Sequence, residues 1–150
     1  MQWSEIMIKD YVCIAAGVVG TFLVKALGGW DESLTALMVF MTIDYITGVM
    51  VAAVFQNSPK TESGGIESKA GWQGLCRKCV TLLFVIIAHY LDLMLNVDYV
   101  RNGVIIGFLT NELISIVENA GLMGIPLPPV ITKALDVLKN QKGGKENGKN

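Results

Sequence analysis

Several carboxyl groups lie inside long apolar stretches of this sequence, where ionisable side chains are rare. Asp44 lies near the middle of residues 34–55, and Glu112 and Glu118 lie within residues 103–125. An acid at membrane depth is costly, so it normally faces protein or water and marks a functional position. These acids could form a packing contact between helices, the wall of a water-filled pore, or a pathway for protons or cations.

A histidine and an aspartate lie close together in a third apolar stretch, residues 79–95. His89 and Asp92 are three residues apart, which places them on neighbouring faces of a helix. One interpretation is a proton-sensitive pair. The other, which we favour, is two polar groups near the outer membrane interface that are wetted by water.

Two of the three cysteines form a C-R-K-C motif, Cys76 to Cys79. The neighbouring cations would favour thiolates, which are the forms that bind metals and exchange disulfides. A zinc site needs four ligands, however, and the one histidine, His89, lies within an apolar stretch. We therefore expect two reduced thiols at a membrane boundary, with no metal and no cofactor. Whether the two cysteines pair is left open.

The remaining residues argue against an enzyme and against nucleic-acid binding. A hydrolase needs a nucleophile with its base, or a set of metal ligands, and neither set is evident. Residues 64–69 contain glycines but lack the spacing of a phosphate-binding loop. The formal net charge is −1, whereas nucleic acid favours a basic surface. The sequence thus predicts a protein that is not an enzyme and has no nucleic-acid partner.

Long apolar segments position the acids described above. Hydrophobic residues make up 52% of the 150 residues and charged residues only 17%, too little polar matter to cover these segments in water. A helix of roughly 20 apolar residues crosses a bilayer. We predict an all-α integral membrane protein with about four transmembrane helices and short amphipathic helices, which oligomerises. The predicted spans are residues 11–27, 34–55, 79–95 and 103–125.

The second span carries small residues around its acid. Thr47 and Gly48 follow Asp44 by about one helical turn, and Ala52 lies one turn beyond Gly48. Small side chains allow transmembrane helices to approach closely. We predict that these four residues form a buried contact that fixes the helix arrangement.

Residues 66–78 are predicted to form an interfacial helix that carries cations toward lipid headgroups. Lys69, Trp72, Arg77 and Lys78 would lie at the membrane surface. The same residues also fit the charged beginning of the next span, and the sequence does not separate the two interpretations. We treat residues 1–139 as one membrane domain, with an amphipathic helix at 130–138 and a disordered tail at 140–150.

The cations predict the orientation in the membrane. With four spans and the N-terminus inside, ten Lys and Arg residues lie on the inner side, and Arg101 alone lies in the outer turns. Cytoplasmic segments are enriched in such residues, so we expect both termini in the cytoplasm of a bacterial cell. Residues 11–27 could instead be a signal peptide, but Lys25 lies where cleavage signals are usually neutral. A three-span arrangement remains an alternative.

The last span carries a polar stripe. Projected at 100° per residue, its polar side chains fall within a wedge of about 120°, opposite an apolar side. Such a stripe is stable only against water, other polar groups or another subunit. We predict that it lines a pore or an intersubunit seam, and the alternative is that it packs within one subunit. The stripe consists of Asn111, Glu112, Ser115, Glu118 and Asn119.

Three patches of sequence, in this order and spacing, resemble the phage and toxin-secretion holins of the clostridial toxin-export type. The resemblance extends over roughly residues 34–135, and the C-R-K-C pair is a departure from the family pattern. The patches are DYITG at 44–48, SKAGWQGLCRK at 68–78, and NELISIVEN at 111–119 followed by Gly124, Pro126 and Pro128.

This resemblance implies a small phage-encoded membrane protein that accumulates harmlessly in the bacterial cytoplasmic membrane. It would then oligomerise into lesions that release a murein hydrolase (an endolysin) or a toxin and so time host cell lysis. Its partners would be itself, the lipid bilayer and the released cargo. Two other classes remain open: a small proton or cation channel or transporter subunit, and a membrane scaffold subunit.

Overall fold

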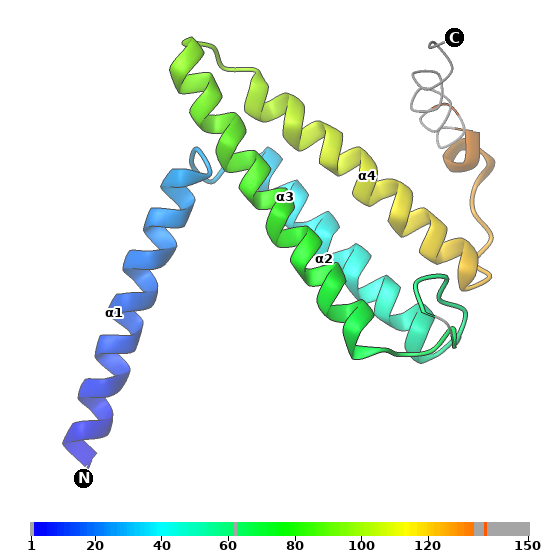
Figure 1. The fold of residues 1–150 in the computed structure, drawn as a ribbon, viewed down its shortest axis with the longest axis horizontal. Helices are drawn as coiled ribbons and strands as arrows, with labels where there is room; N and C mark the ends of the chain where they lie inside the picture. The colour runs from blue at the N-terminus through cyan, green and yellow to red at the C-terminus, as the bar shows by residue number, and fades with distance from the viewer. Residues whose placement is uncertain (1, 62, 134–136, 138–150) are drawn as a thin grey trace. The chain divides into compact units, whose positions relative to one another are not determined.

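Long helices build the protein in a computed structural model, which describes residues 2–61, 63–133 and 137. All regular secondary structure in these residues is helical, and four helices are long and apolar enough to cross a membrane. The prediction of an all-α membrane protein with four spans is therefore confirmed. The helices are α1, Gln2–Ala26, α2, Glu32–Ala53, α3, Ser68–Leu95, and α4, Val100–Leu122 (Figure 1).

Helix α3 includes residues 68–78 of the segment 66–78 that was predicted as an interfacial helix. It runs without a break for 28 residues from Ser68, about 42 Å at 1.5 Å per residue. A bilayer's hydrocarbon core is only about 30 Å thick, so part of α3 extends beyond it. Lys69, Trp72 and Arg77 are exposed and Lys78 is half-buried. Their position at the membrane surface stays a prediction.

The C-terminal predictions fall largely outside the described residues. Residues 129–133 are helical, which is the described beginning of the region predicted as an amphipathic helix at 130–138. The predicted tail at 140–150 lies outside the described residues.

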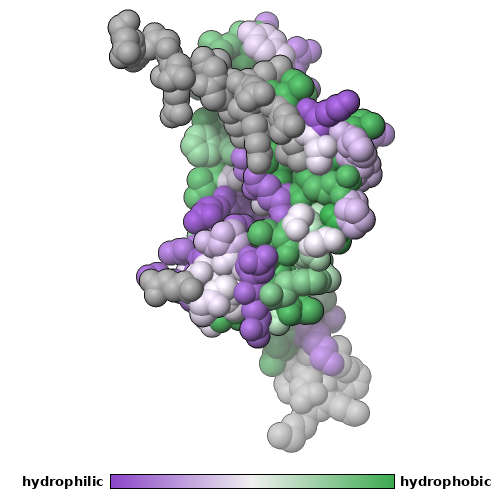
Figure 2. Space-filling model, turned by 90° about the vertical axis from the view of Figure 1, so that its right-hand side faces the viewer, coloured by the Kyte–Doolittle hydropathy of each residue, from purple (hydrophilic) through white to green (hydrophobic). Residues whose placement is uncertain are grey.

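Large apolar side chains are exposed along all four helices. Phe22, Leu83 and Ile106 are 69%, 56% and 62% exposed, and hydrophobic side chains form patches on the face drawn in Figure 2. Soluble proteins rarely expose apolar surface on this scale, whereas lipid tails match it. The surface therefore suits a multi-pass membrane protein.

The described residues divide into two compact units. The first draws on Met1–Met38 and Arg77–Phe108, and the second on Val39–Cys76 and Leu109–Asn150. Helices α2, α3 and α4 each contribute residues to both units. Each unit is described by itself below.

In the first unit, α1 ends in a tight corner. The N–H of Gly29 donates to the carbonyl of Val24 (2.9 Å) and that of Gly28 to Lys25 (3.1 Å), a Schellman motif. Both glycines have positive φ, +88° and +96°, which side chains other than glycine adopt only with strain. The Asp31 carboxylate then accepts a hydrogen bond from Leu34 N–H at 2.8 Å and caps the start of α2.

The α3–α4 connection depends on Asp92, near the end of α3. Its two carboxylate oxygens accept hydrogen bonds from the backbone N–H groups of Val100 and Arg101, both at 2.9 Å. These N–H groups belong to the first turn of α4, where a carboxylate is favoured by the unpaired donors and the helix dipole. Asp92 is 7% exposed, so the expectation of a water-wetted group near the interface is wrong. Burial is possible because the helix terminus replaces water as the hydrogen-bond donor.

A buried arginine joins the two corners of the first unit. Arg101 Nε donates to the carbonyl of Leu27 at 2.6 Å, and Nη2 donates to that of Gly29 at 3.2 Å. Nη1 forms an ion pair with Asp31 Oδ2 at 2.6 Å. We call these contacts the Arg101 clasp. They leave no room beside Gly28, where a Cβ would lie 2.7 Å from His89 Nδ1 and 2.8 Å from Arg101 Nε.

Two neighbouring glycines allow a matched test of the clasp. Gly28→Ala and Gly29→Ala each force an L-residue to positive φ, which costs about 1–2 kcal/mol. Only Gly28→Ala also meets His89 and Arg101, because nothing lies within 4 Å of a Cβ at Gly29. Overpacking of that kind adds about 1–3 kcal/mol. Thermal unfolding in detergent, followed by circular dichroism, should therefore show a lower midpoint for Gly28→Ala, and equal midpoints would contradict the packing described.

Candidate functional site: the polar face of α4

The polar stripe of α4 is divided between the interior of the second unit and its surface. Glu112 and Asn119 are buried, at 6% and 5% exposed. Asn111 and Glu118 are exposed and Ser115 is half-buried. Glu112 and Asn119 thus lie on one part of the polar wedge of α4, and the other three polar residues lie on another part. We call Asn111, Ser115 and Glu118 the exposed edge of α4.

Asn119 joins α4 to α2 through polar contacts. Its side-chain amide nitrogen lies 3.0 Å from Thr47 Oγ1, 3.2 Å from Asp44 Oδ1 and 3.4 Å from the Asp44 carbonyl. An amide NH₂ has two hydrogens, so the three acceptors share two donors. The Thr47 hydroxyl in turn donates to the Asp44 carbonyl at 3.1 Å. Residues predicted separately, as a helix-packing set and as a polar stripe, thus meet in one network.

Small residues allow the helices of this unit to approach. A Cβ at Gly48 would lie 3.7 Å from Asn119 Nδ2, so glycine there leaves the amide close to the α2 backbone. On the α3 segment, a Cβ at Gly71 would lie 3.7 Å from the Tyr45 hydroxyl, and one at Gly74 would lie 4.0 Å from the same ring. The three patches at 44–48, 68–78 and 111–119 therefore all contribute to the second unit. Ala52, the fourth residue of the predicted packing set, is half-buried on α2.

A different side of α4 is covered by the chain that follows it. Ile114 and Val117 form a buried pair, 9% and 7% exposed, against which the half-buried Leu127 packs. Asn57, in the loop after α2, donates its side-chain amide to the carbonyl of Leu122 at 3.3 Å. The second half of α4 is thus contacted by two connecting segments.

The first unit contains the polar residue whose role the sequence did not reveal. Arg101 entered the sequence analysis only as a cation in an outer turn, yet it is the centre of the clasp. The hydrogen bond from Arg101 lowers the pKa of Asp31 below its ordinary value of 3.8. A signal was present, because the other short outer turn carries Asp31 and Glu32, and opposite charges in two short turns on one side of a membrane are natural partners.

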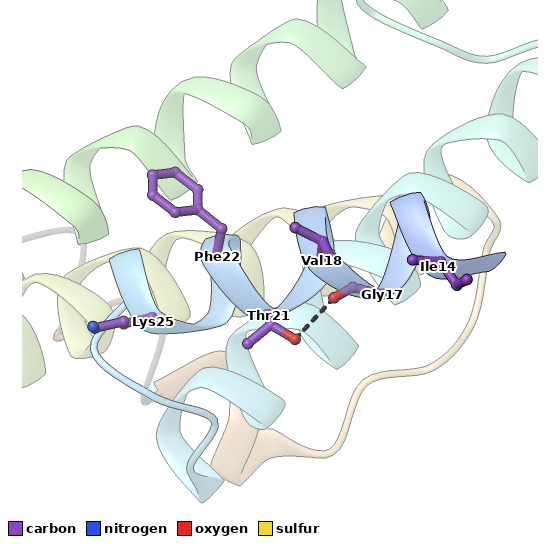
Figure 3. Close-up of a pocket in the computed structure, with 6 residues that line it drawn as sticks. All are labelled: Ile14, Gly17, Val18, Thr21, Phe22 and Lys25. Carbon is purple, nitrogen blue, oxygen red and sulfur yellow. Dashed lines mark hydrogen bonds between the residues drawn. The ribbon is translucent and has the colours of Figure 1, made fainter. Parts of the chain in front are cut away.

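No metal centre is evident in the described part of the chain. Among these residues, no group of three or more His, Cys, Asp and Glu side chains could hold a metal ion. Cys13, Cys76 and Cys79 are free and exposed thiols. A shallow depression on α1 is lined entirely by that helix, between Ile14 and Lys25, and contains the hydrogen bond from Thr21 Oγ1 to the Gly17 carbonyl, 2.8 Å long (Figure 3). It is a furrow between turns of one helix rather than a cleft between elements.

Comparison with known proteins decides the family. The model of the bacteriophage holin family matches residues 21–140, most of the chain. The chain belongs to the bacteriophage holin family. The match includes α2, α3 and α4 and begins within the last turns of α1. The asparagine network and the exposed edge of α4 therefore both lie in the part that matches the family.

Individual relatives extend over most of this chain. A protein named "Probable holin" from Bacillus phage phi105 is 31% identical over 120 residues, 79% of this chain and 83% of the relative. An uncharacterized protein of Halalkalibacterium halodurans is 34% identical over 144 residues, 92% of this chain and 98% of the relative. An uncharacterized protein of Clostridium perfringens is 32% identical over 134 residues, 87% of this chain and 93% of the relative. No solved structure gives a significant match.

The buried and exposed asparagines of α4 should respond differently to the same substitution. Asn119→Leu removes the donor shared by the half-buried Asp44 and Thr47, and the loss of hydrogen bonds there costs about 1–3 kcal/mol. Asn102→Leu changes an exposed side chain at the beginning of the same helix and should alter stability by no more than about 0.5 kcal/mol. Unfolding in mixed micelles with increasing sodium dodecyl sulfate measures both. An Asn119→Leu variant as stable as Asn102→Leu would contradict the network.

The ion pair of Asp31 predicts a dependence of stability on pH. Because its pKa is lower in the folded protein, the carboxylate stabilises the fold at pH values above its ordinary 3.8. This contribution is lost as the pH falls from about 4 through the lowered pKa. The unfolding midpoint of the wild type should therefore exceed that of Asp31→Asn at pH 7, and the difference should shrink at pH 3. A difference that stays constant between these pH values would show that the ionised carboxylate is not the stabilising form.

Proposed function

We propose that this protein is a holin that accumulates in the bacterial cytoplasmic membrane and then oligomerises through the exposed edge of α4. The lesions so formed release a murein hydrolase from the cytoplasm and time host cell lysis. Membership of the holin family and the phage relative named "Probable holin" support this proposal. The observation that carries it is a row of polar side chains, two exposed and one half-buried, on a helix long enough to span a bilayer.

The spacing of the exposed edge suits contact with another helix. Asn111, Ser115 and Glu118 are separated by four and then three residues, the spacing that keeps side chains on one seam of packed helices. Polar side chains at membrane depth are better accommodated against another protein surface or against water than against lipid tails. Contact between copies, or water in a lesion, would supply such surroundings. The edge therefore favours association over dispersal once enough copies are present.

The buried half of the stripe would have a different role in the same process. Asn119 binds α2, and Glu112 is buried in the same unit. In the proposed mechanism they hold α4 in place, so that copies associate without unfolding. The five stripe residues would then divide into a seam of three and an internal contact of two.

The proposed orientation places both termini in the cytoplasm. The exposed Lys69, Trp72 and Arg77 at the beginning of α3 would contact lipid headgroups on that side. The protein itself would catalyse no reaction, and its partner, an endolysin or a toxin, would act as cargo. Lesion width would decide which folded proteins pass.

The test is delayed lysis of a bacterial host that also expresses a cytoplasmic murein hydrolase without an export signal. Abrupt loss of optical density that requires both proteins supports the proposal. Ion leakage with the hydrolase retained inside would instead identify a narrow channel. No effect, with the protein confirmed in the membrane, would favour a scaffold role.

Removing the exposed edge should abolish hydrolase release. Asn111→Leu with Glu118→Leu makes the edge apolar and compatible with lipid, so copies lose the reason to associate there. Membrane insertion, measured by fractionation and blotting, should be unchanged. Thr21→Leu is the matched control, because it replaces an exposed polar residue on α1 and should preserve the time of lysis. Lysis at the normal time by the double variant would exclude this edge as the seam.

A further inference from the structure

The segment after α4 covers one side of that helix. Leu127 packs against the buried pair Ile114 and Val117, although Val117 lies five residues and Ile114 eight residues before the end of α4 at Leu122, about one and a half and two turns. The chain must therefore reverse direction after the helix and return along it. We call residues 125–129 the returning segment.

Local sequence fixes this reversal. Gly124 has a φ of +74°, and its N–H donates to Gly121 O at 3.0 Å while Ile125 N–H donates to Ala120 O at 3.1 Å. These bonds form a Schellman motif that ends the helix. Prolines at 126, 128 and 129 restrict the returning segment and prevent it from continuing α4. The helical residues 129–133 then begin at Pro129.

The covered side and the α2-bonded side lie far apart around α4. At 100° per residue, Val117 lies about 200° from Asn119, and Ile114 lies about 200° from Glu112. The exposed edge separates these two sides. One side of α4 is thus bonded to α2, the opposite side is covered by the returning segment, and polar groups are exposed between them.

The two sides differ in the kind of contact that holds them. Asn119 makes directional hydrogen bonds with Asp44 and Thr47, whereas Leu127 makes an apolar contact. Between transmembrane helices, apolar packing against protein competes with equally apolar packing against lipid. The contact of Leu127 is therefore the more readily exchanged of the two.

We propose that the returning segment is a latch that covers Ile114 in a single copy and is replaced by α4 of a second copy during assembly. Uncovering Ile114 joins it to the exposed edge, because residues 111, 114, 115 and 118 follow the i, i+3, i+4, i+7 pattern of a helix-packing seam. With the latch closed, this seam lacks its apolar member. The latch would regulate the assembly of copies that is described in the proposed function, and this inference rests on that function.

The first arm of the test measures contact between copies. In a background with Cys13, Cys76 and Cys79 changed to Ser, Ile114→Cys reports disulfides between two α4 helices in vesicles of phosphatidylethanolamine and phosphatidylglycerol. Leu127→Ser should raise the rate of this cross-linking several-fold, and Leu127→Met, which keeps the packing, should leave it at the parent rate. Equal cross-linking rates in the parent, Leu127→Ser and Leu127→Met would overturn the proposed latch.

The second arm locks the latch. Val117→Cys with Leu127→Cys, oxidised within one chain, should abolish both the assembly of copies, measured with an amine-reactive cross-linker, and the release of a trapped folded fluorescent protein. A reductant should restore both in the same double variant, so that the reduced chain is the matched control for the oxidised one. Assembly and release at the parent rate by the locked chain would refute the proposal, as would locked and unlocked chains with equal assembly.

The two arms separate the latch from the proposed function. If the parent assembles but releases no protein, the holin function fails. The latch is then still judged by whether Leu127→Ser accelerates cross-linking and whether locking prevents assembly.

Discussion

The shared amide of Asn119 is the contact on which the arrangement of the second unit depends. It joins α4 to both Asp44 and Thr47 of α2, in segments that would otherwise place a carboxylate and an amide against lipid. Apolar surface gives little reason for helices to associate in a bilayer, so polar contacts and close approach decide which sides meet. Gly48, beside Asn119, allows that approach. Once Asn119 is committed to α2, the angular position of the whole of α4 is fixed, and with it the positions of the remaining polar groups.

Polar side chains also hold the corners of the first unit. Asp92 binds the N–H groups that begin α4, and Arg101 binds the carbonyls that end α1. Each charged group therefore meets the helix terminus of opposite partial charge. The short α1–α2 and α3–α4 connections need such side chains, because few other hydrogen-bond partners lie within the turn for their backbone N–H and carbonyl groups. The corners are held by side chains, which leaves the exposed surfaces of the helices available to lipid or to other copies.

The sequence predicted the helical class and the number of spans because bilayer thickness sets the length of an apolar helix. It also singled out Asp44 and Asn119, because polar residues are conspicuous in apolar segments. It did not reveal that these two bind each other, since periodicity describes one helix and contains no information about its neighbour. For Arg101 the acidic Asp31 of the other short turn was a usable signal, but its remaining partners are the carbonyls at positions 27 and 29, and a carbonyl has no sequence signature. The continuity of α3 through residue 78 was likewise undecided, because charged residues fit either the interface or the first turns of a span.

The central claim is that Asn111, Ser115 and Glu118 face another copy while Glu112 and Asn119 face the interior. A cysteine scan of residues 109–122, in a background without the native cysteines, tests it most directly through disulfides formed between copies in the membrane. The account predicts maxima at 111, 115 and 118 and minima at 112 and 119. A scan without helical periodicity, or one with its maxima at 112 and 119, would contradict the assignment of this edge as the seam.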